Sequence, residues 1–240
     1  MTTVNKTQAG TIVRLAVVLA ATLAAGSANA AMVWSSPTTI SGDSDVKAGA
    51  VFAAFNFTGA LTTVNGVTFN PFSGMTVGNL TVTSCCGISG NGAIFGAGPA
   101  FAGLSDSYQA LLIGAIFSAE LRLTIGGLTS GQLYQVEFWV NDTRILDPAR
   151  NETFTDGATS GIVSFNSTGA IGGLGQFLIG NFTASGPTEQ ITVSGNALAQ
   201  LNGMSVLVGP ASSVPEPSTV ILSGGCLVAL FAARRRRRTI

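Results

Sequence analysis

The sequence predicts an all-β body built as a single β-sandwich. Short runs of aromatic and β-branched residues recur along the chain and are separated by turns rich in Gly, Asn and Ser, which is the pattern of a sandwich or barrel. Only 9% of the 240 residues are charged and 31 are glycine, so few stretches suit a long helix. Residues 31–210 have the length of one domain.

The clearest predicted strand runs from Leu133 to Val140. Every second residue is aromatic or β-branched, so the face that carries Phe138 is expected against the core. The alternate face, which carries Glu137 and Trp139, is expected to point outward. Trp139 and Tyr134 are weak candidates for stacking on a sugar, and a covering strand or crossing loop over Trp139 is the favoured alternative.

Further strands and turns follow from the same pattern. The predicted strands are 50–57, 66–69, 80–83, 120–125, 161–165, 176–182, 190–194 and 204–208. The predicted turns are Asn65-Gly66, Gly126-Gly127, Ser130-Gly131, Asp156-Gly157, Gly186-Pro187 and Asn202-Gly203. Residues 105–117 predict either a short amphipathic helix across one end of the sandwich or two more strands.

The N-terminus has the three regions of a signal peptide. Basic residues precede an apolar run from Leu15 to Ala25, and small residues then give an A-x-A pattern at Ala28 and Ala30. We expect residues 1–30 to be removed by cleavage after Ala30. The alternative is an uncleaved anchor, but the apolar run is short for a membrane span.

The C-terminus carries a second address in three parts. These are the motif Val214, Pro215, Glu216 and Pro217 within the linker 211–217, the apolar run 218–233, and the block Arg234, Arg235, Arg236, Arg237 and Arg238 within the tail 234–240. The prolines favour an extended segment. As a helix the apolar run would be about 24 Å long, so it spans a bilayer with help from snorkelling arginines or local thinning. The arginines predict a cytoplasmic tail and an exported body.

This composite tail resembles the PEP-CTERM sorting signal, a tail also described as an ice-binding protein C-terminal domain. The resemblance implies processing by an exosortase, a membrane protease, in Gram-negative bacteria that make extracellular polysaccharide. It implies transient anchoring in the inner membrane, followed by a cell-surface or secreted form. Ice binding does not follow from the name, and an ordinary tail anchor after a proline-rich linker is the alternative.

The body also resembles a recurrent β-sandwich family of PEP-CTERM proteins. The matching stretches are Ile40-Ser41-Gly42-Asp43-Ser44-Asp45-Val46, Val64-Asn65-Gly66-Val67-Thr68-Phe69, 127–134 with Phe138 and Asn141-Asp142-Thr143-Arg144, and Gln200-Leu201-Asn202-Gly203. The last two are similar to jelly-roll carbohydrate-binding and malectin-like modules. The resemblance implies a jelly-roll-like sandwich and carries over no catalytic residues.

The charge of the body argues against some partners. Without the two addresses it has four basic and ten acidic residues, a net charge of −6. Nucleic acid and anionic lipid both require a basic face, so neither is expected as a partner.

Sequence motifs point away from catalysis. The chain has no histidine, which removes histidine-based triads and metal sites, and it has no Walker A, G-x-S-x-G or G-x-G-x-x-G motif. No cofactor is expected. Asp43 and Asp45 could offer calcium ligands, but a solvated turn is favoured.

Paired carboxylates could still hydrolyse glycans without histidine. The candidates by residue type are Glu120, Glu137, Asp142, Asp147 and Glu152. A structural ion pair or loop clamp is favoured for Asp142 with Arg144. The neighbouring Arg144 and Arg150 are expected to keep the carboxylates around them ionised.

Cys85 and Cys86 are adjacent in the exported body, where oxidation is expected. A vicinal disulfide, two separate thiols and pairing between molecules all remain open. Cys226, in the apolar run, is expected to pack there, with lipidation as a minor option.

The expected function is that of an exported, exosortase-processed protein with a structural, adhesive or polysaccharide-binding role in the extracellular matrix, and not an enzyme. The alternative is a glycan hydrolase that uses two carboxylates.

Overall fold

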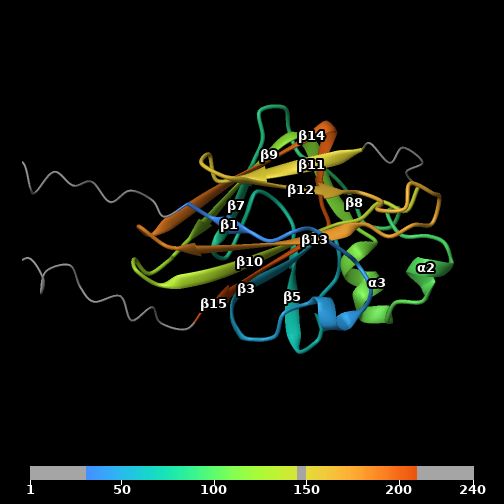
Figure 1. The fold of residues 1–240 in the computed structure, drawn as a ribbon, viewed down its shortest axis with the longest axis horizontal. Coiled ribbons are helices and arrows are strands. Elements are labelled where there is room, and N and C mark those ends of the chain that lie inside the picture. Colours follow the sequence, from blue (N-terminus) through green and yellow to red (C-terminus); the bar gives the residue numbers. More distant parts are fainter. Residues whose placement is uncertain (1–30, 145–149, 210–240) are drawn as a thin grey trace, which may run out of the picture. The chain divides into compact units, whose positions relative to one another are not determined.

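The computed structural model describes residues 31–144 and 150–209, which form a two-sheet β-sandwich (Figure 1). The predicted all-β sandwich is therefore confirmed. The chain divides into two units between Pro210 and Ala211, and only the first contains described residues.

The first sheet has the strand order β1-β13-β10-β15-β3-β5-β4, and β2 pairs with the start of β13. All pairs are antiparallel except β3 with β5, which are parallel over three residues. The bounds are β1 Val33–Trp34, β2 Thr38–Thr39, β3 Ala50–Phe57, β4 Thr62–Val64, β5 Val67–Phe72, β10 Leu133–Val140, β13 Gln176–Thr183 and β15 Gly203–Val208.

The second sheet has the order β12-β11-β14-β9-β7-β6, and β8 pairs with the start of β9. Its pairs are all antiparallel, and β14 carries a bulge between Ser194 and Ala199. The bounds are β6 Thr76–Val77, β7 Leu80–Thr83, β8 Ser89–Asn91, β9 Ala115–Gly126, β11 Asn151–Thr155, β12 Ser160–Ser164 and β14 Thr188–Leu201.

Three of the predicted strands have the bounds that the structure shows. The predicted ranges 50–57, 80–83 and 133–140 coincide with β3, β7 and β10. Other predicted strands are present with shifted or longer bounds, while β1, β2, β4, β6, β8 and β11 were not predicted. Most of these are only two or three residues long, too short to show a period.

In the segment 105–117 the helix alternative is confirmed, and two further strands are not formed there. Residues Asp106–Leu112 form helix α3, and β9 begins at Ala115. The hydroxyl of Ser105 accepts a hydrogen bond from the Tyr108 amide, which caps the helix at its first turn. A second, shorter helix, α2, spans Pro99–Ala102.

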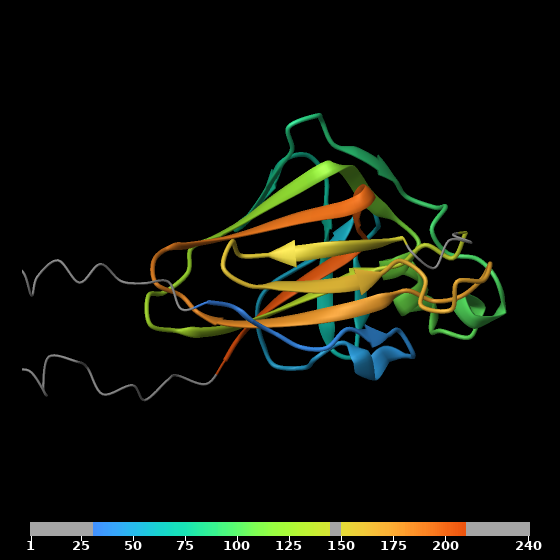
Figure 2. The same ribbon diagram turned by 45° about the horizontal axis from the view of Figure 1, so that its top comes forward.

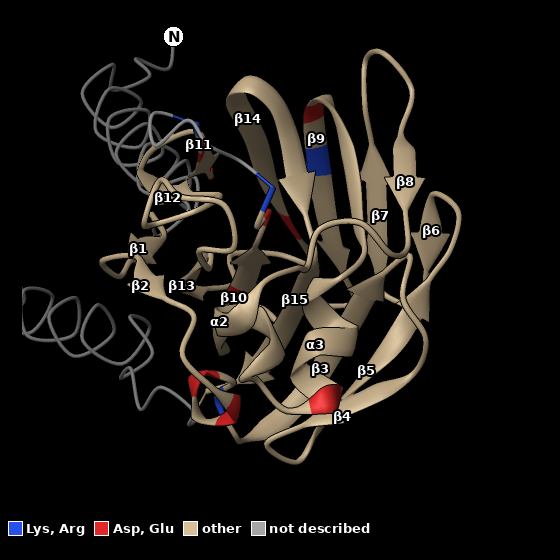
Figure 3. Cartoon of the chain, turned by 90° about the vertical axis from the view of Figure 1, so that its right-hand side faces the viewer, with Lys and Arg blue, Asp and Glu red and all other residues tan. Residues whose placement is uncertain are grey.

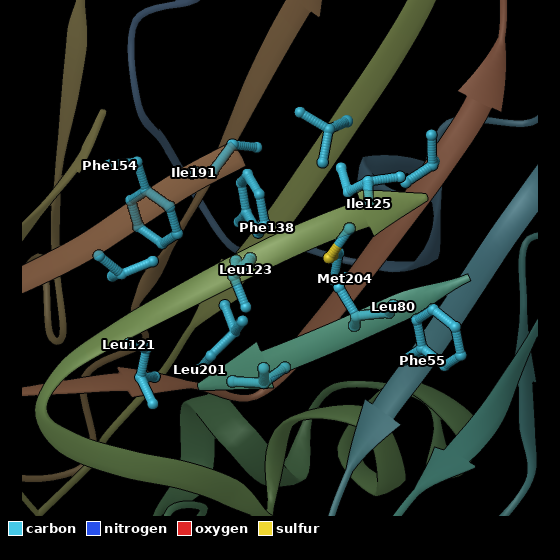
Figure 4. Packing of buried hydrophobic residues seen from close by; sticks show 14 of the residues in the cluster. Phe55, Leu80, Leu121, Leu123, Ile125, Phe138, Phe154, Ile191, Leu201 and Met204 are labelled. Atoms are coloured by element: carbon cyan, nitrogen blue, oxygen red, sulfur yellow. The ribbon is translucent and has the colours of Figure 1, made fainter. Parts of the chain in front are cut away.

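The main core lies between the sheets (Figure 4). The rings of Phe138 on β10 and Phe154 on β11 stack with centroids 4.6 Å apart, and Leu123, Ile191 and Met204 pack in the same cluster. Phe138 is fully buried, which confirms the face predicted for it.

A second apolar layer covers the outer face of the first sheet. It contains Trp139 from β10, Phe69 from β5, Tyr108 and Leu111 from α3, and Ile40 from the segment before the 3₁₀ turn Asp43–Asp45. Trp139 is fully buried, so the prediction that its ring could stack on a sugar is wrong. The alternative, in which other segments cover Trp139, is confirmed. Tyr134 is also buried, in the main core.

The first and last strands lead to the same end of the body. β1 starts and β15 finishes there, beside the start of β10, where the Gly209 amide donates to the Leu133 carbonyl. Helices α2 and α3 lie at the opposite end in both views (Figures 1 and 2).

Candidate functional site

The helical end of the sandwich is held by a buried network of side-chain amides. Asn202 stands at the corner where the chain passes from β14 in one sheet to β15 in the other. Its amide nitrogen donates to the carbonyls of Leu112 and Gly114, and its oxygen accepts from the backbone of Asn141 at 2.8 Å. The side chain of Gln200 donates to the carbonyl of Asn141 and to Asn202.

Asn141 extends this network to the neighbouring loops. Its side chain donates to the Phe95 carbonyl and accepts from the Gly175 amide, and it is fully buried. These contacts give the sequence stretches 141–144 and 200–203 a structural role, because each buried amide fixes a loop to the end of a strand.

Asp142 forms the loop clamp that the sequence predicted. Its buried carboxylate accepts from Arg144 through Nε and Nη2 at 3.0 and 2.9 Å, and Arg150 approaches it at 3.4 Å. The Arg144 guanidinium lies over the Phe95 ring and that of Arg150 over the Phe165 ring. Asp142 is thus enclosed by two stacked cations.

Glu152 behaves differently from the expectation for this cluster. It lies on β11 and is fully buried, and its Oε2 accepts from the Gln200 amide at 2.7 Å. Burial raises the pKa of Glu152 well above its usual range, against the opposing charge of Arg150. The expectation that the arginines would keep the surrounding carboxylates ionised is therefore wrong for Glu152. Asp147 lies outside the described residues.

Glu137 is on the predicted outer face of β10, but it is not solvated. Its side chain is 1% exposed and lies under the second apolar layer. The Oε2 atom accepts from the Lys47 amide at 3.1 Å, and burial raises the pKa of Glu137 to about 8. Its strand neighbour on β15 is Ser205. The remaining candidate, Glu120, pairs at the surface of β9 with Arg122 at 2.6 Å.

The 3₁₀ turn is fixed by Asp45, which is buried rather than solvated. Its carboxylate accepts from the amides of Ser41 and Gly42, from the Ser41 hydroxyl and from the Tyr108 hydroxyl, which in turn accepts from the Trp139 indole. Among the residues that the structure describes, no three His, Cys, Asp or Glu side chains come together in a way that could hold a metal ion.

Two hollows flank the place where the chain crosses from β5 to β6, and the sequence predictions did not include either. The first groove has a volume of about 500 Å³ and lies between this crossing and the β7–β8 connection. It is lined by Thr58, Phe72, Ser73, Gly74, Met75, Ser84, Gly87, Ile88, Ser89, Gly90 and Ile116. Phe72 and Ile116 are buried, whereas Met75 is 60% exposed.

The second groove lies on the other side of the crossing and has a volume of about 570 Å³. It is lined by Phe52, Ala53, Ala54, Phe55, Asn70, Pro71, Val77, Gly78 and Asn79. Strand β5 pairs with β3 only from Phe55 to Phe57, so the preceding part of β3 has no strand beside it on this side.

Neither groove contains a charged side chain. Residues 48–105 include no Asp, Glu, Lys, Arg or His, and nearly all of the lining comes from this stretch. In Figure 3 the strands β5, β6, β7 and β8 are accordingly free of acidic and basic colour. A long charge-free stretch in an exported body is the sequence signal that could have located the grooves.

Cys85 and Cys86 lie in the β7–β8 connection at the edge of the first groove. Both are exposed and carry free thiols, and their Sγ atoms are 2.6 Å apart. The two sulfur atoms are thus neighbours, and the vicinal disulfide, the separate thiols and pairing between molecules all stay predictions.

The predicted addresses lie outside the described residues. This applies to the cleavage site at Ala28 and Ala30, the motif 214–217, the apolar run with Cys226, and the basic block 234–238. Within the described part of the chain, no helix has both the length and the apolar character needed to cross a bilayer.

Comparison with known proteins identifies the tail. The family described as the PEP-CTERM protein-sorting motif matches residues 213–237. The chain carries a PEP-CTERM sorting motif. The motif indicates an exported protein that is anchored in a membrane before an exosortase processes it.

No curated protein matches the chain. One similar solved structure is the exo-β-1,3-galactanase Pc1,3Gal43A from Phanerochaete chrysosporium with galactose, at 18% identity and a TM-score of 0.26. The match covers 55% of this chain and only 30% of the galactanase chain.

Proposed function

We propose that this exported PEP-CTERM protein serves in the extracellular matrix and that its body binds a neutral polysaccharide through the two grooves. The observation that carries the proposal is the absence of charge from both groove linings within an otherwise acidic body. A neutral glycan offers hydroxyl groups and apolar ring faces, and it needs no charged partner.

The lining of the first groove suits such a ligand. Hydroxyls of Ser73, Ser84 and Ser89 supply donors and acceptors, while Phe72 and Met75 supply apolar surface. The second groove adds the amides of Asn70 and Asn79. A ligand chain crossing both grooves would lie against the charge-free strands β5 and β6.

Three of the five candidate carboxylates of a hydrolase lie away from both grooves. Asp142 and Glu152 are fully buried in the polar network, and Glu137 is under the second apolar layer. Glycoside hydrolysis requires an acid and a second carboxylate on either side of an accessible glycosidic bond. Among the described residues, neither groove offers such a pair, which supports binding over hydrolysis.

A glycan array with the processed protein tests this proposal. We expect binding to neutral glycans, with little salt dependence because no ion pairs form. Met75→Glu places a charge in the first groove and should weaken binding at least about tenfold, which corresponds to about 1.4 kcal/mol. Ile171→Glu is the matched control, because Ile171 is similarly exposed but lies in another loop.

Three outcomes would contradict the proposal. The first is binding to no neutral glycan, and the second is an equal effect of Met75→Glu and Ile171→Glu. The third is hydrolysis of the glycan that Glu152→Gln abolishes while the protein stays folded, which would favour the hydrolase.

A further inference from the structure

The backbone and hydrogen bonds connect the two adjacent cysteines to residues that line the first groove. Ser84 precedes them and Gly87 follows them, and both of these residues line the groove. The Ser118 hydroxyl on β9 contacts the Ser84 hydroxyl at 2.6 Å and donates to the Gly87 carbonyl at 2.7 Å. The Cys86 amide donates to the Ser84 hydroxyl. A change of backbone conformation at the cysteines should therefore shift Ser84 and Gly87, the two residues that Ser118 contacts.

The thiols are placed for oxidation. Both are exposed, so a soluble oxidant can reach them, and their Sγ atoms lie next to each other at 2.6 Å. The sorting motif indicates export, and exported proteins meet oxidising conditions.

A bond between neighbouring residues differs from an ordinary disulfide. Consecutive Cα atoms are about 3.8 Å apart, which is closer than the roughly 4.4–6.8 Å found across most disulfides. The backbone must adjust to close the bond, so the bond is more easily reduced than a long-range staple. It also closes no loop of chain, so it contributes little to the stability of the fold.

We propose that Cys85 and Cys86 form a reversible vicinal disulfide whose closing reshapes the edge of the first groove. The oxidant is a disulfide, either a small molecule or a protein. One cysteine thiolate attacks the donor disulfide and expels one thiol, which leaves a mixed disulfide. The second cysteine then attacks the mixed disulfide and expels the second thiol. The pair loses two electrons and two protons, and the donor gains them.

Thiol counting on the full chain tests the bond itself. The Cys226→Ser variant removes the third cysteine, so that only Cys85 and Cys86 can react. After treatment with oxidised glutathione, we expect a monomer that takes up no iodoacetamide, and two alkyl groups after mild reduction. Two alkyl groups without reduction, a persistent glutathione adduct or a disulfide-linked dimer would each overturn the proposal.

Hydrogen exchange measured by mass spectrometry tests the effect on the groove. Oxidation should change amide exchange by at least about twofold in residues 84–90 and leave β10 unchanged. In the Cys85→Ser/Cys86→Ser variant the oxidant should change neither segment. Unchanged exchange in residues 84–90 of the oxidised protein would refute the coupling.

This inference rests on the proposed function only in treating the first groove as the binding site. Neither thiol counting nor hydrogen exchange uses a glycan, so both can succeed where the glycan array fails. If binding is found, oxidation should alter neutral-glycan affinity at least about threefold in the Cys226→Ser protein and not in the variant that also lacks both thiols.

Discussion

At position 137 a buried carboxyl group accepts one hydrogen bond at its Oε2 atom, from the Lys47 amide. The Oε1 atom of Glu137 and the hydroxyl of Ser205, its neighbour on β15, have no hydrogen-bond partner within the described residues. Burial favours the neutral carboxyl, while the amide of Lys47 and its charge favour the ionised form, and Asp45 opposes ionisation. Burial is the largest of these effects, so the group retains its proton well above the usual range.

This proton links stability to pH. The folded pKa of Glu137 is about 8, against 4.5 for the unperturbed group, so the folded state holds a proton that the unfolded state releases between these values. The stabilisation is complete below pH 4.5 and is lost as the pH rises toward 8, by at most about 1.4 kcal/mol per pH unit. Glu152 acts in the same direction. Glu137→Gln should therefore flatten the pH dependence of the free energy of unfolding.

Urea titrations at several pH values between 5 and 8 measure this slope. Glu120→Gln, at the surface of β9, is the control and should keep the slope of the unmodified protein. If Glu137→Gln and the unmodified protein have the same slope, the buried proton is absent.

Buried and exposed apolar side chains also differ in what they contribute to stability. Phe138→Ala should destabilise the body by about 3–5 kcal/mol, because its ring is fully buried against Phe154. Ile162→Ala on β12 removes an apolar side chain that is 54% exposed, and it should change stability by less than about 0.5 kcal/mol. Equal losses in a urea titration would contradict this description of the core.

At the scale of the element, the corner between β14 and β15 depends on one side chain. Asn202 occupies the single position between the two strands, and its side-chain hydrogen bonds reach the residue after β10, the end of α3 and the residue before β9. A Cβ on the following Gly203 would approach Leu111 at 2.6 Å, so the helix packs closely over the corner. The corner thus joins the two sheets and the helix.

Asn202→Ala should therefore cost about 3 kcal/mol or more. It leaves the buried amide of Asn141 and the carbonyls of Leu112 and Gly114 without partners, and each such group costs roughly 1–3 kcal/mol. Asn181→Ala is the control, because its side chain contacts Gln135 at a partly buried position on β13. A urea titration in which both variants lose the same stability would show that the corner has no special role.

The sequence predicted those elements whose buried face follows from the pattern of neighbouring residues. The alternation along β10 identified the buried face with Phe138, because a strand places every second side chain on one side. It could not identify which segments cover Trp139, since they are α3 and the segment around the 3₁₀ turn, which are distant in the chain. Strand β11 was missed because it turns Glu152 inward, where the pattern expects an apolar residue.

The candidate site was less accessible to sequence reasoning than the fold. Single amides such as Asn141 and Gln200 have no periodicity, and only the three-dimensional structure brings them together. The ion pair of Asp142 with Arg144 could be predicted because the two residues are two positions apart at the end of a strand. The grooves depend on segments from both sheets, so their shape is not encoded in any one stretch.

At the scale of the whole molecule, processing should leave a protein with two new ends. We expect the mature N-terminus at Ala31 and a C-terminus between Val214 and Pro217, because A-x-A and PEP-CTERM motifs occupy these positions. Mass spectrometry of the released protein measures both ends. Changing Glu216 to Ala should retain the protein in the membrane, while Ser213→Ala should be processed normally. Protein in the medium that still contains residues 234–238 would contradict processing.

The shared end of β1 and β15 makes the body a candidate for circular permutation. Val33, Asn181, Gln135 and Leu207 form one row across the first sheet, so three strand spacings, or about 14 Å, separate the first strand from the last. A short glycine linker can bridge that gap, and new ends can be opened between the exposed residues Gly157 and Ala158. We expect such a rearranged chain to fold into the same body, with both grooves present.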